Sequence, residues 1–401
     1  MSKKRIVLIS VWFPPTKGVA VNRMEAFADY LGSENDVTVI TLGEQDQVAE
    51  RKFGEVHYIE NNPIWRRIKH QQSDGKLLHH AKSLVNLLAH RFGLSPYKSW
   101  KKRAEKLAVE LHRKKAFDIV ISSYAPIEAH EVAYSLKLKS PELMWFADMR
   151  DEMSGNPFEQ ESVKQKLRKK ELLYGKHITL LTSVAAPIVD EFKVLMPDVK
   201  HFLEVRNGFN HTIEPSHNFN DKFTIVYAGT FYGKRKPDIF FEGIKNLRDR
   251  GEIGEDILFK FIGTSHNFNI PDQLRSFVEF VPQLSYLEAI KMMAEADCNL
   301  LINPPLGTKG QYSGKIFDYA SVEKPILAYV DLQDVAAELI REHNAGIAVD
   351  FDDVKGGEKA IKELYELWKQ KREFPIKKEK SRELHRKYQV QKINEFIQTL
   401  K

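Results

Sequence analysis

The sequence has little of what disulfide frameworks, metal centres and membrane spans require. Its one cysteine, Cys298, cannot form an internal disulfide or supply a cysteine-rich metal site. The longest apolar runs, such as Ile6–Ser10 and Asp118–Ser122, fall far short of the roughly 20 residues that a membrane-spanning helix needs. With 42% hydrophobic and 29% charged residues, the composition is that of a folded protein. We expect a buried, inert thiol and a cytoplasmic location.

The N-terminal sequence MSKKRIVLIS starts with basic residues, but its apolar run is broken at Trp12-Phe13-Pro14-Pro15. We interpret this segment as a first β-strand rather than a signal peptide. The sequence also has no fixed-period repeat, no low-complexity tract and no G-x-G-x-x-G pattern after the first strand. These absences exclude a repeat fold and weaken a dinucleotide-binding interpretation.

Positive charge is concentrated in one segment of the chain. Residues 60–115 contain 14 Lys and Arg against 4 Asp and Glu, a net charge of +10, whereas the whole chain carries +6. Apolar residues recur there at helical spacing, which predicts a basic amphipathic helical insertion. Such a segment can attract nucleic acid or an anionic membrane surface, or it can be a solvated helix pair. The recurring apolar residues are Trp65, Ile68, Leu77, Leu78, Ala81, Leu84, Val85 and Leu88.

Short β-rich runs alternate with helical stretches in both halves of the sequence, which indicates parallel sheets with crossover helices. In the first half the predicted strands are Arg5–Ser10, Asp36–Thr41, Val56–Glu60, Asp118–Ser122, Leu143–Ala147, Ile178–Thr182 and Leu203–Val205. In the second half they are Phe223–Ala228, Leu258–Ile262, Val278–Val281, Cys298–Ile302, Ile326–Tyr329 and Ile347–Asp350. The predicted helices of the second half are Pro237–Arg248, Tyr286–Ala296, Gly314–Ser321, Val335–His343 and Glu358–Lys369.

The two halves meet near Asn207-Gly208, a dipeptide typical of sharp turns, and the polar stretch Asn210–Asp221 reads as a linker. Pro375 then precedes a last amphipathic helix at about Lys378–Leu400. Two open sheets joined in this way predict a cleft at the carboxyl ends of their strands, where such sheets bind ligands.

Two segments of the first half carry candidate chemistry. Lys17 and Gly18 follow the first strand and precede a helix, where exposed N–H groups favour an anion or hydroxyl groups; an ordinary strand-to-helix loop is the alternative. Asp148, Arg150 and Asp151 follow a later strand, where a carboxylate can bind sugar hydroxyls or assist proton transfer. An ion pair closing the loop, or Asp148 capping a turn, is the alternative. His130 is either an acceptor-side group or a half-buried structural histidine.

Two segments of the second half combine glycines with cations. Gly229, Thr230 and Gly233 precede Lys234-Arg235-Lys236 and a helix, a combination of free backbone and fixed charge that suits a diphosphate; a solvated basic loop is the alternative. Further on, Ser313 is the expected N-cap of a helix that begins Gly314-Lys315, which also suits phosphate. Asp318 lies one turn later, so a plain Lys315–Asp318 surface pair is the alternative there.

The order of these segments resembles the retaining family-4 glycosyltransferases, and most of all their bacterial branch that builds cell-surface polysaccharides. The residues that carry the resemblance are Pro14-Pro15-Thr16-Lys17-Gly18, Trp145-Phe146-Ala147-Asp148-Met149-Arg150-Asp151, Asn207-Gly208-Phe209, Tyr227-Ala228-Gly229-Thr230-Phe231 and Ser313-Gly314-Lys315-Ile316-Phe317-Asp318-Tyr319. The resemblance extends from the first strand to about Asp350, and the Ser-Gly-Lys run ahead of Lys324-Pro325 is its most specific part.

The resemblance implies an α/β protein of the GT-B fold, with two Rossmann-like domains and parallel sheets that face a central cleft. Residues 1–208 would bind the acceptor, a lipid-linked or cell-surface glycan, and would carry the basic insertion at 60–115. Residues 209–375 would bind a nucleotide-diphosphate sugar, and residues 376–401 would cross back to the first domain. The implied reaction is hexosyl transfer with retention of anomeric configuration. It implies no cofactor and no metal, and the sequence shows no H-x-x-x-H pattern or carboxylate cluster that suggests a metal site.

Residue roles follow from the resemblance only where positions match. Catalysis would involve Arg235, Lys315 and Asp148. The donor side would comprise Gly18, Gly229, Thr230, Lys234, Arg235, Val281, Ser313, Gly314, Lys315 and Asp318, and the acceptor side would comprise Lys17, His130, Asp148, Arg150 and Asp151. Asp318 stands where the family usually has a glutamate that holds the ribose hydroxyls. Eight positions earlier the family usually has a second glutamate, and this chain has Gly310 there.

Other classes remain open at this stage. The absence of a glutamate at Gly310 leaves a catalytically inactive scaffold or subunit of the same architecture as one alternative. A nucleic-acid-binding protein that uses residues 60–115 is another, although no nucleic-acid-binding motif accompanies the charge. A sugar-nucleotide epimerase on the same architecture is a third, but its carboxylates and histidines are not evident. We expect a nucleotide-sugar and a glycan as partners, with no nucleic acid, and an anionic membrane at the inner face of the cell as a further candidate surface.

Overall fold

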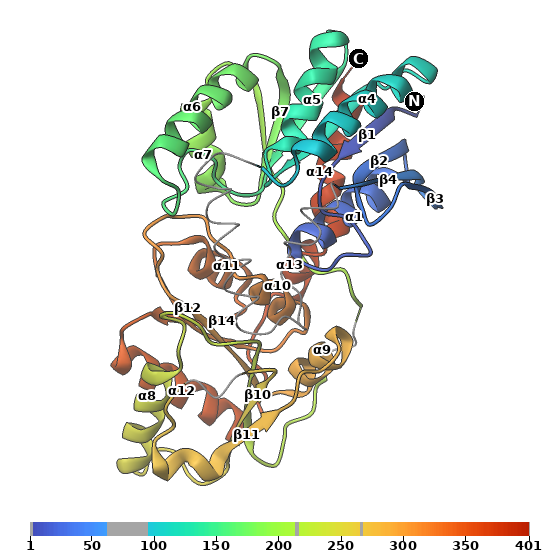
Figure 1. Cartoon of the computed structure of the whole chain (residues 1–401). Helices are drawn as coiled ribbons and strands as arrows, with labels where there is room; N and C mark the ends of the chain where they lie inside the picture. Colours follow the sequence, from blue (N-terminus) through green and yellow to red (C-terminus); the bar gives the residue numbers. More distant parts are fainter. Residues whose placement is uncertain (1–2, 62–94, 213–215, 265–267, 401) are drawn as a thin grey trace, which may run out of the picture. The chain divides into compact units, whose positions relative to one another are not determined.

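The computed structural model describes residues 3–61, 95–212, 216–264 and 268–400. The chain divides into two compact units, which are coloured along the sequence in Figure 1. The first unit comprises Met1–Val205 and Val390–Lys401, and the second comprises Arg206–Gln389. Among the described residues, no helix is both long enough and apolar enough to cross a membrane.

The described residues of the first unit form an eight-stranded sheet in the order β3-β4-β2-β1-β5-β6-β7-β8. The strands pair in parallel, except that β3 pairs antiparallel with β4 at the edge. The strands are β1 (Arg5–Ile9), β2 (Asp36–Gly43), β3 (Gln47–Arg51), β4 (Gly54–Glu60), β5 (Ile119–Tyr124), β6 (Met144–Met149), β7 (Ile178–Ser183) and β8 (His201–Glu204). The helices are α1 (Val19–Leu31), α4 (Lys98–Lys114), α5 (Glu128–Lys139), α6 (Glu161–Gly175) and α7 (Ala186–Leu195).

The central strands of this sheet are continuous apolar runs because both faces are covered. On one face, α1 buries Met24, Phe27 and Leu31 against β1 and its neighbours. The end of the chain completes the same core, because Val390, Ile393 and Ile397 belong to it. The last twelve residues therefore belong to the first unit by their apolar packing.

The second unit contains a six-stranded parallel sheet in the order β11-β10-β9-β12-β13-β14. Its strands are β9 (Phe223–Ala228), β10 (Ile257–Ile262), β11 (Val278–Val281), β12 (Cys298–Asn303), β13 (Ile326–Val330) and β14 (Gly346–Asp350). Its helices are α8 (Asp238–Asp249), the 3₁₀ helix η1 (Asp272–Phe277), α9 (Tyr286–Glu295), α10 (Gly314–Ser321), α11 (Val335–His343), α12 (Val354–Lys369) and α13 (Lys378–Glu383). The final helix, α14 (Arg386–Thr399), begins in this unit.

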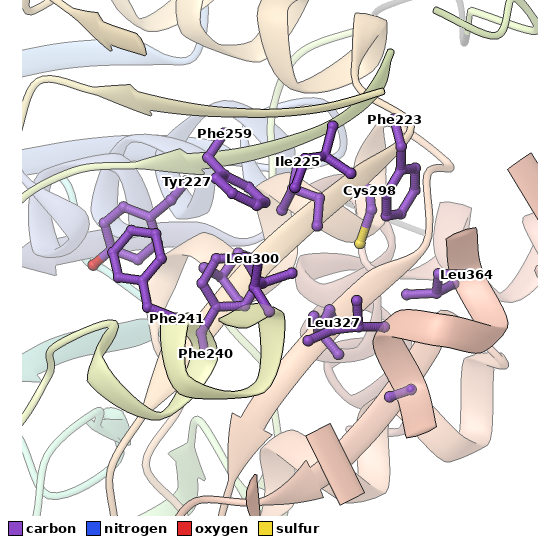
Figure 2. Close-up of a cluster of buried hydrophobic side chains, with 14 of the residues drawn as sticks. Phe223, Ile225, Tyr227, Phe240, Phe241, Phe259, Cys298, Leu300, Leu327 and Leu364 are labelled. Atoms are coloured by element: carbon purple, nitrogen blue, oxygen red, sulfur yellow. The ribbon is translucent and has the colours of Figure 1, made fainter. Parts of the chain in front are cut away.

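An aromatic cluster fills one face of the second sheet (Figure 2). Phe240 and Phe241 from α8 pack edge-on against Phe259 of β10. Cys298 lies within this cluster and is fully buried, as predicted, and burial raises the pKa of its thiol. Tyr227 lies at the border of the cluster with its hydroxyl oxygen directed away from it. The packed face thus presents one phenol to the carboxyl edge of the sheet.

Three features differ from the sequence-based expectation. β3 was not predicted, because its residues Gln47–Arg51 are polar and mostly exposed. The last helix is not continuous: it is split between α13 and α14, where the N–H of Arg386 donates to the carbonyl of Phe209. The units divide at Val205 rather than at Gly208, and α13 stays in the second unit because Leu384 packs in its core. Most of the predicted basic insertion, including Trp65 to Leu88, lies outside the described residues, and α4 is its described part.

Candidate functional site

The second unit has a topological switch point between β9 and β12. From β9 the chain moves to one side of the sheet through β10 and β11, and then returns to the other side at β12. Open parallel sheets bind ligands at the carboxyl edge of such a point, because the loops diverge there. β9 ends at Ala228 and β12 ends at Asn303. The loop after β9 and the helix α10 supply the side chains at this edge.

Lys315, in the first turn of α10, extends back over the end of β9. Its Nζ donates to the Tyr227 hydroxyl at 2.9 Å and lies 4.5 Å from the centre of the Tyr227 ring. The Tyr227 hydroxyl in turn donates to the carbonyl of Thr230 at 3.2 Å. Gly229 leaves the room that Lys315 occupies, since a Cβ at that position would stand 2.8 Å from the Lys315 Cε. Three segments therefore position one ammonium group.

Arg235 reaches the same edge from the loop after β9. Its Nη2 donates to the Asn303 side chain at 2.8 Å, and its Nη1 donates to the Tyr232 hydroxyl at 2.9 Å. The guanidinium also stacks on the Tyr232 ring, 4.9 Å from its centre. The buried Nε of Arg235 has no hydrogen-bond partner among the described residues. Neutral groups hold this guanidinium, so its positive charge is not compensated.

The two cations lie near each other without a counter-ion. In the described parts of the chain, neither Lys315 nor Arg235 forms an ion pair with a carboxylate. Burial, together with the positive charge of Arg235, lowers the pKa of Lys315 to about 7. A buried cation without a partner is costly, and an anion between the two would relieve that cost. The electrostatics of this edge therefore favour a bound phosphate or diphosphate.

Helix α10 adds its N-terminus to the same edge. Ser313 is its N-cap, as predicted, but the Ser313 side chain makes no capping hydrogen bond and the first turn contains no acidic residue. Gly314 is exposed. The N–H groups at the start of the helix and the helix dipole favour an anion here. Thr230, Lys234 and Lys236 are exposed on the loop after β9, so only Arg235 of this basic run is held in a defined position.

Replacing Gly229 with alanine tests this packing. Gly229 has φ +107, and a new Cβ would displace Lys315, so we expect nucleotide affinity to fall by about tenfold, the equivalent of one weakened charge-assisted bond. Gly233→Ala is the matched control, because Gly233 also has a positive φ, +56, but nothing lies within 4 Å of its Cβ position. Isothermal titration calorimetry measures both variants. Equal losses in the two would show that the contact with Lys315 does not matter.

Asp318 is not the partner of Lys315. Its Oδ1 instead accepts a hydrogen bond of 2.6 Å from the Tyr286 hydroxyl, so the plain surface pair left open by the sequence does not form. Burial raises the pKa of Asp318 to about 6, although the Tyr286 hydrogen bond and the charge of Arg386 oppose the rise. Val281 lies half-buried at the end of β11, and its carbonyl accepts from the N–H of Gly263. Both residues lie at the carboxyl side of the sheet.

Gly310 has a backbone that explains its identity. It has φ +91, a conformation that favours glycine, and its N–H donates to the Asp334 side chain at 2.7 Å. Asp334 also caps α11. A glutamate at position 310 would require a different loop, because it could not adopt this conformation without strain.

The first unit has an equivalent switch point between β1 and β5. Gly18 is the N-cap of α1, with φ +142 and open space around its Cβ position, and Lys17 is exposed beside it. Helix α1 has neither a side-chain cap nor an acidic residue in its first turn. Trp12 donates from its indole nitrogen to the carbonyl of Ala125 after β5, which ties the two loops together.

Asp148 is not placed to touch a substrate. It is 1% exposed, and its carboxylate is bound by the Arg23 guanidinium at 2.7 Å, Thr182 at 2.8 Å and Ser123 at 2.9 Å. Burial alone would raise the pKa of Asp148, but Arg23 and these hydroxyl groups hold it below its ordinary value. Arg23 also donates to the carbonyl of Val205. The predicted catalytic role of Asp148 is therefore corrected to a structural one, and Arg23 is the partner that the sequence did not indicate.

Of the other predicted acceptor-side residues near Asp148, His130 and Arg150 make structural contacts and Asp151 is exposed. His130 is fully buried, its Nδ1 lies 2.7 Å from the Ser122 hydroxyl, and burial lowers its pKa to about 4. The acceptor-side prediction for His130 is corrected accordingly, since no substrate can reach this ring. Arg150 donates to the carbonyls of Tyr124 and Ala125 and so braces the loop after β5. Asp151 retains an exposed carboxylate.

The residues that sequence reasoning missed are Tyr227, Asn303, Tyr286 and Arg23. The first two stand at or near strand ends, a position that could have marked them. Arg23 and Tyr286 gave no local signal, because their partners are 125 and 32 residues away. No group of three or more His, Cys, Asp or Glu side chains in the described ranges is arranged to hold a metal ion.

Comparisons with known proteins show similarity in structure but not in sequence. No model of a known protein family matches the chain, and no curated protein matches it in sequence. Solved structures match it over nearly the full length of both chains. Sucrose-phosphate synthase from Thermosynechococcus elongatus has a TM-score of 0.66 at 13% identity and covers 99% of each chain. Anabaena HepE, solved with UDP-glucose, has a TM-score of 0.60 at 12% identity and covers 99% of this chain and 100% of its own.

The third structure is an α,α-trehalose-phosphate synthase from Burkholderia xenovorans, solved with glucose-6-phosphate. It has a TM-score of 0.60 at 11% identity and covers 98% of this chain and 100% of its own. Identities this low establish the fold alone. The likenesses confirm the predicted fold class, a GT-B protein with two Rossmann-like units built on parallel sheets.

Proposed function

We propose that this protein is a glycosyltransferase that takes a sugar from a nucleotide-diphosphate donor held by the second unit. The observation that supports this most strongly is the pair of uncompensated cations, Lys315 and Arg235, at the switch point of the second sheet. The uncapped N-terminus of α10 lies at the same edge. This combination matches the charge of a diphosphate better than that of a neutral ligand.

The same cations have a chemical role in transfer. When the bond between the anomeric carbon and the donor oxygen breaks, negative charge grows on the leaving diphosphate. Lys315 and Arg235 would stabilise that charge more strongly than the charge of the intact donor, which lowers the barrier. Tyr227 and Asn303 position the two cations without neutralising them. We therefore propose Arg235 and Lys315 as the catalytic residues of the second unit.

The remaining donor contacts are proposed from position. Asp318 would accept hydrogen bonds from the ribose hydroxyls, and Thr230 and Gly314 would offer backbone N–H groups to the phosphates. Gly229, whose N–H already donates to the carbonyl of Ile262, would contribute by leaving room for Lys315. Val281 would lie beside the base, at the end of β11. In the first unit, Lys17 ahead of α1, with Arg150 and Asp151 after β6, forms the proposed acceptor side. Lys234 would add a mobile positive charge.

The structural neighbours support the same donor class. One of them was solved with UDP-glucose and another with UDP-2-fluoro glucose. A UDP-sugar is therefore the first donor to test. We further propose that transfer proceeds without a metal ion, because Lys315, Arg235 and the α10 N-terminus can neutralise the diphosphate themselves. Retention of anomeric configuration is proposed from the resemblance to the family-4 enzymes. The proposed acceptor is a lipid-linked or cell-surface glycan.

A thermal-shift screen tests the donor site. Nucleoside diphosphates and their sugars, carrying uracil, guanine, adenine or thymine, are compared with inorganic diphosphate and with the uncharged nucleosides. We expect at least one nucleotide-diphosphate sugar to raise the melting temperature in a concentration-dependent way, because a ligand that binds the folded state stabilises it. No stabilisation by any nucleotide would remove the proposed function.

An inactive scaffold is the second candidate, and Gly310 favours it, since no carboxylate stands where the resembled family has one. The two candidates differ in turnover rather than in binding. Release of nucleoside diphosphate from the bound sugar nucleotide, with water or a glycan mixture as acceptor, supports the transferase. Tight binding without any release supports the scaffold.

We also propose that the protein acts in the cytoplasm and binds the inner face of the membrane through α4. This helix exposes Lys102 and Lys106 on one face. A cationic patch of this kind gains about 1 kcal/mol per charge near an anionic leaflet. Co-sedimentation with vesicles that contain phosphatidylserine or only phosphatidylcholine measures the effect.

We expect the double variant Lys102→Glu/Lys106→Glu to lose most of its binding to the anionic vesicles. Lys355→Glu/Lys359→Glu is the matched control, because these two lysines are also exposed four residues apart, on α12 of the second unit. Equal sedimentation of the wild type with both kinds of vesicle would contradict membrane attachment through charge.

A further inference from the structure

Asp318 belongs to a chain of hydrogen bonds within the second unit. The Tyr286 hydroxyl donates to the Asp318 Oδ1 at 2.6 Å and lies 3.1 Å from the His211 Nδ1. The other ring nitrogen of His211, Nε2, lies 2.7 Å from the Ser321 Oγ. The Ser321 hydroxyl then donates to the backbone carbonyl of Asp318 at 2.6 Å. The chain therefore begins and ends on the same residue.

With Asp318 ionised, the four contacts of this chain share three hydrogens, and the tautomer of His211 follows from the direction of the Ser321 hydrogen bond. The Asp318 carbonyl can only accept, so the single hydrogen of the Ser321 hydroxyl points to it. Ser321 must then accept from His211, which places a hydrogen on Nε2 and leaves a lone pair on Nδ1. Tyr286 also has one hydrogen, and it can serve either the Asp318 carboxylate or His211, but not both. When Asp318 is ionised, the contact between Tyr286 and His211 contains no hydrogen.

One added proton satisfies every contact. If it binds Asp318, the carboxylic acid donates to the Tyr286 oxygen, and Tyr286 turns its own hydrogen toward the Nδ1 of His211. The alternative, a proton on His211 with an ionised Asp318, satisfies the same contacts but places a second cation near Arg386. The neutral ring of His211 thus stabilises the protonated form of Asp318 through Tyr286.

We propose that Tyr286 and His211 are positioning residues that set the proton affinity of Asp318 and thereby make nucleotide binding sensitive to mild acid. The role of Asp318 as the hydrogen-bond acceptor for the ribose hydroxyls rests on the proposed function. The relay, which is the hydrogen-bonded set of Asp318, Tyr286, His211 and Ser321, rests on the geometry alone. An ionised Asp318 is a charged acceptor on both oxygens, even while Oδ1 accepts from Tyr286, whereas in the protonated form Oδ1 becomes a donor to Tyr286 and the negative charge is lost. Acidification therefore removes acceptors from the ribose site.

The charged surroundings agree with this direction. Burial raises the pKa of Asp318 to about 6, and burial with the charges of Arg386 and His385 lowers the pKa of His211 to about 4. The proton thus rests on Asp318. Five titratable or charged groups face the relay, from α9, α10, the segment after β8 and the start of α14. They are Tyr286, Tyr319, His211, His385 and Arg386.

The relay gives nucleotide affinity a lower pH limit, and Lys315 gives it an upper one. Below about pH 6 Asp318 takes up its proton, and above about pH 7 Lys315 loses its charge unless the bound anion restores it. Affinity should therefore be highest between these values. Lys315→Met removes the upper limit without changing the lower one, which separates the two groups.

The test measures the pKa of Asp318 in the ligand-free protein by carboxyl ¹³C NMR, with Asp318→Asn to assign the signal. In His211→Phe the protonated form loses its final acceptor, so we expect the pKa of Asp318 to fall by about one unit, the equivalent of one neutral hydrogen bond. In Tyr286→Phe the ionised form loses its donor, so the pKa should rise. Tyr286 is 50% exposed, so this variant keeps its fold even if His211→Phe does not.

The affinity for the nucleotide that the thermal-shift screen identifies is then measured from pH 5 to pH 8. We expect the acid limit to move down in His211→Phe and up in Tyr286→Phe, whereas a merely structural role would lower affinity equally at every pH. An Asp318 pKa that is unchanged in both variants overturns the relay, whatever the protein binds. Shifted pKa values in a protein that binds no nucleotide support the relay and remove the proposed function.

Discussion

Replacing Lys315 or Arg235 with methionine should each weaken nucleotide-diphosphate binding by about 100-fold, and the double variant should show no measurable binding. A hydrogen bond to a charged group contributes about 1.5–3 kcal/mol, and about 1.4 kcal/mol corresponds to a tenfold change. The two cations lack carboxylate partners in the described parts of the chain, so their full charge is available to the ligand. Calorimetric titration at pH 6.5 measures the loss.

The same Lys315→Met variant should be more stable than the wild type in the absence of ligand. Burial of the Lys315 ammonium, with repulsion from Arg235, lowers its pKa to about 7. Methionine keeps the apolar stem over Gly229 and removes the charge, so we expect the melting temperature to rise by about 2–4 °C, the equivalent of about 1 kcal/mol. A residue that only stabilised the fold would show the opposite sign.

Lys234→Met is the matched control for both measurements. Lys234 is one residue from Arg235 but is exposed, so its removal should change affinity by less than about tenfold and stability by less than about 0.5 kcal/mol. Equal losses of affinity in Lys234→Met and Lys315→Met would mean that only general positive charge matters. That result would contradict a defined diphosphate site.

The second large effect is on stability and concerns the first unit. Arg23→Met and Asp148→Asn should each destabilise that unit by about 3–5 kcal/mol, because each leaves the other member of a buried pair without its partner. The side chains are 3% and 0% exposed, and the pair joins α1, β6 and the segment that follows β8. A single missing partner leaves a desolvated charge that no water can reach.

Urea denaturation in a Trp368→Phe background measures the free energy of unfolding of the first unit. The remaining tryptophans, Trp12, Trp65, Trp100 and Trp145, all precede residue 146, so their fluorescence reports on the first unit. Asp151→Asn is the control, since its carboxylate is 57% exposed, and it should change stability by less than about 0.5 kcal/mol. A similarly small change in Asp148→Asn would contradict the structural role assigned to that residue.

Much of the fold could be predicted from the sequence because the elements differ in pattern. Buried parallel strands such as Phe223–Ala228 are continuous apolar runs, and amphipathic helices separate them. β3 escaped prediction because an exposed edge strand needs no apolar face. The break before α14 escaped prediction because neither glycine nor proline marks it; a tertiary contact with Phe209 produces it.

The candidate site likewise contains residues that the sequence could predict and residues that it could not. Gly229, Ser313 and Lys315 could be identified because their positions after a strand and before a helix are local properties of the sequence. Asp148 was misassigned because its local pattern, charges after a strand, is shared by ligand-binding and structural carboxylates. Only the distant Arg23, 125 residues away, distinguishes the two. The His211–Tyr286 contact likewise joins residues 75 positions apart, and no local pattern reports it.

The charge state of Lys315 tests the proposed donor site most directly. The side-chain ¹³Cε signal of Lys315, assigned by its loss in Lys315→Met, is titrated from pH 5 to pH 11 with and without a saturating nucleotide-diphosphate sugar. We expect a pKa near 7 in the free protein and a rise of more than about one unit with the ligand, since a nearby anion favours the charged form. A pKa near the ordinary 10.5 in the free protein, or one that the nucleotide leaves unchanged, would contradict a diphosphate bound between Lys315 and Arg235.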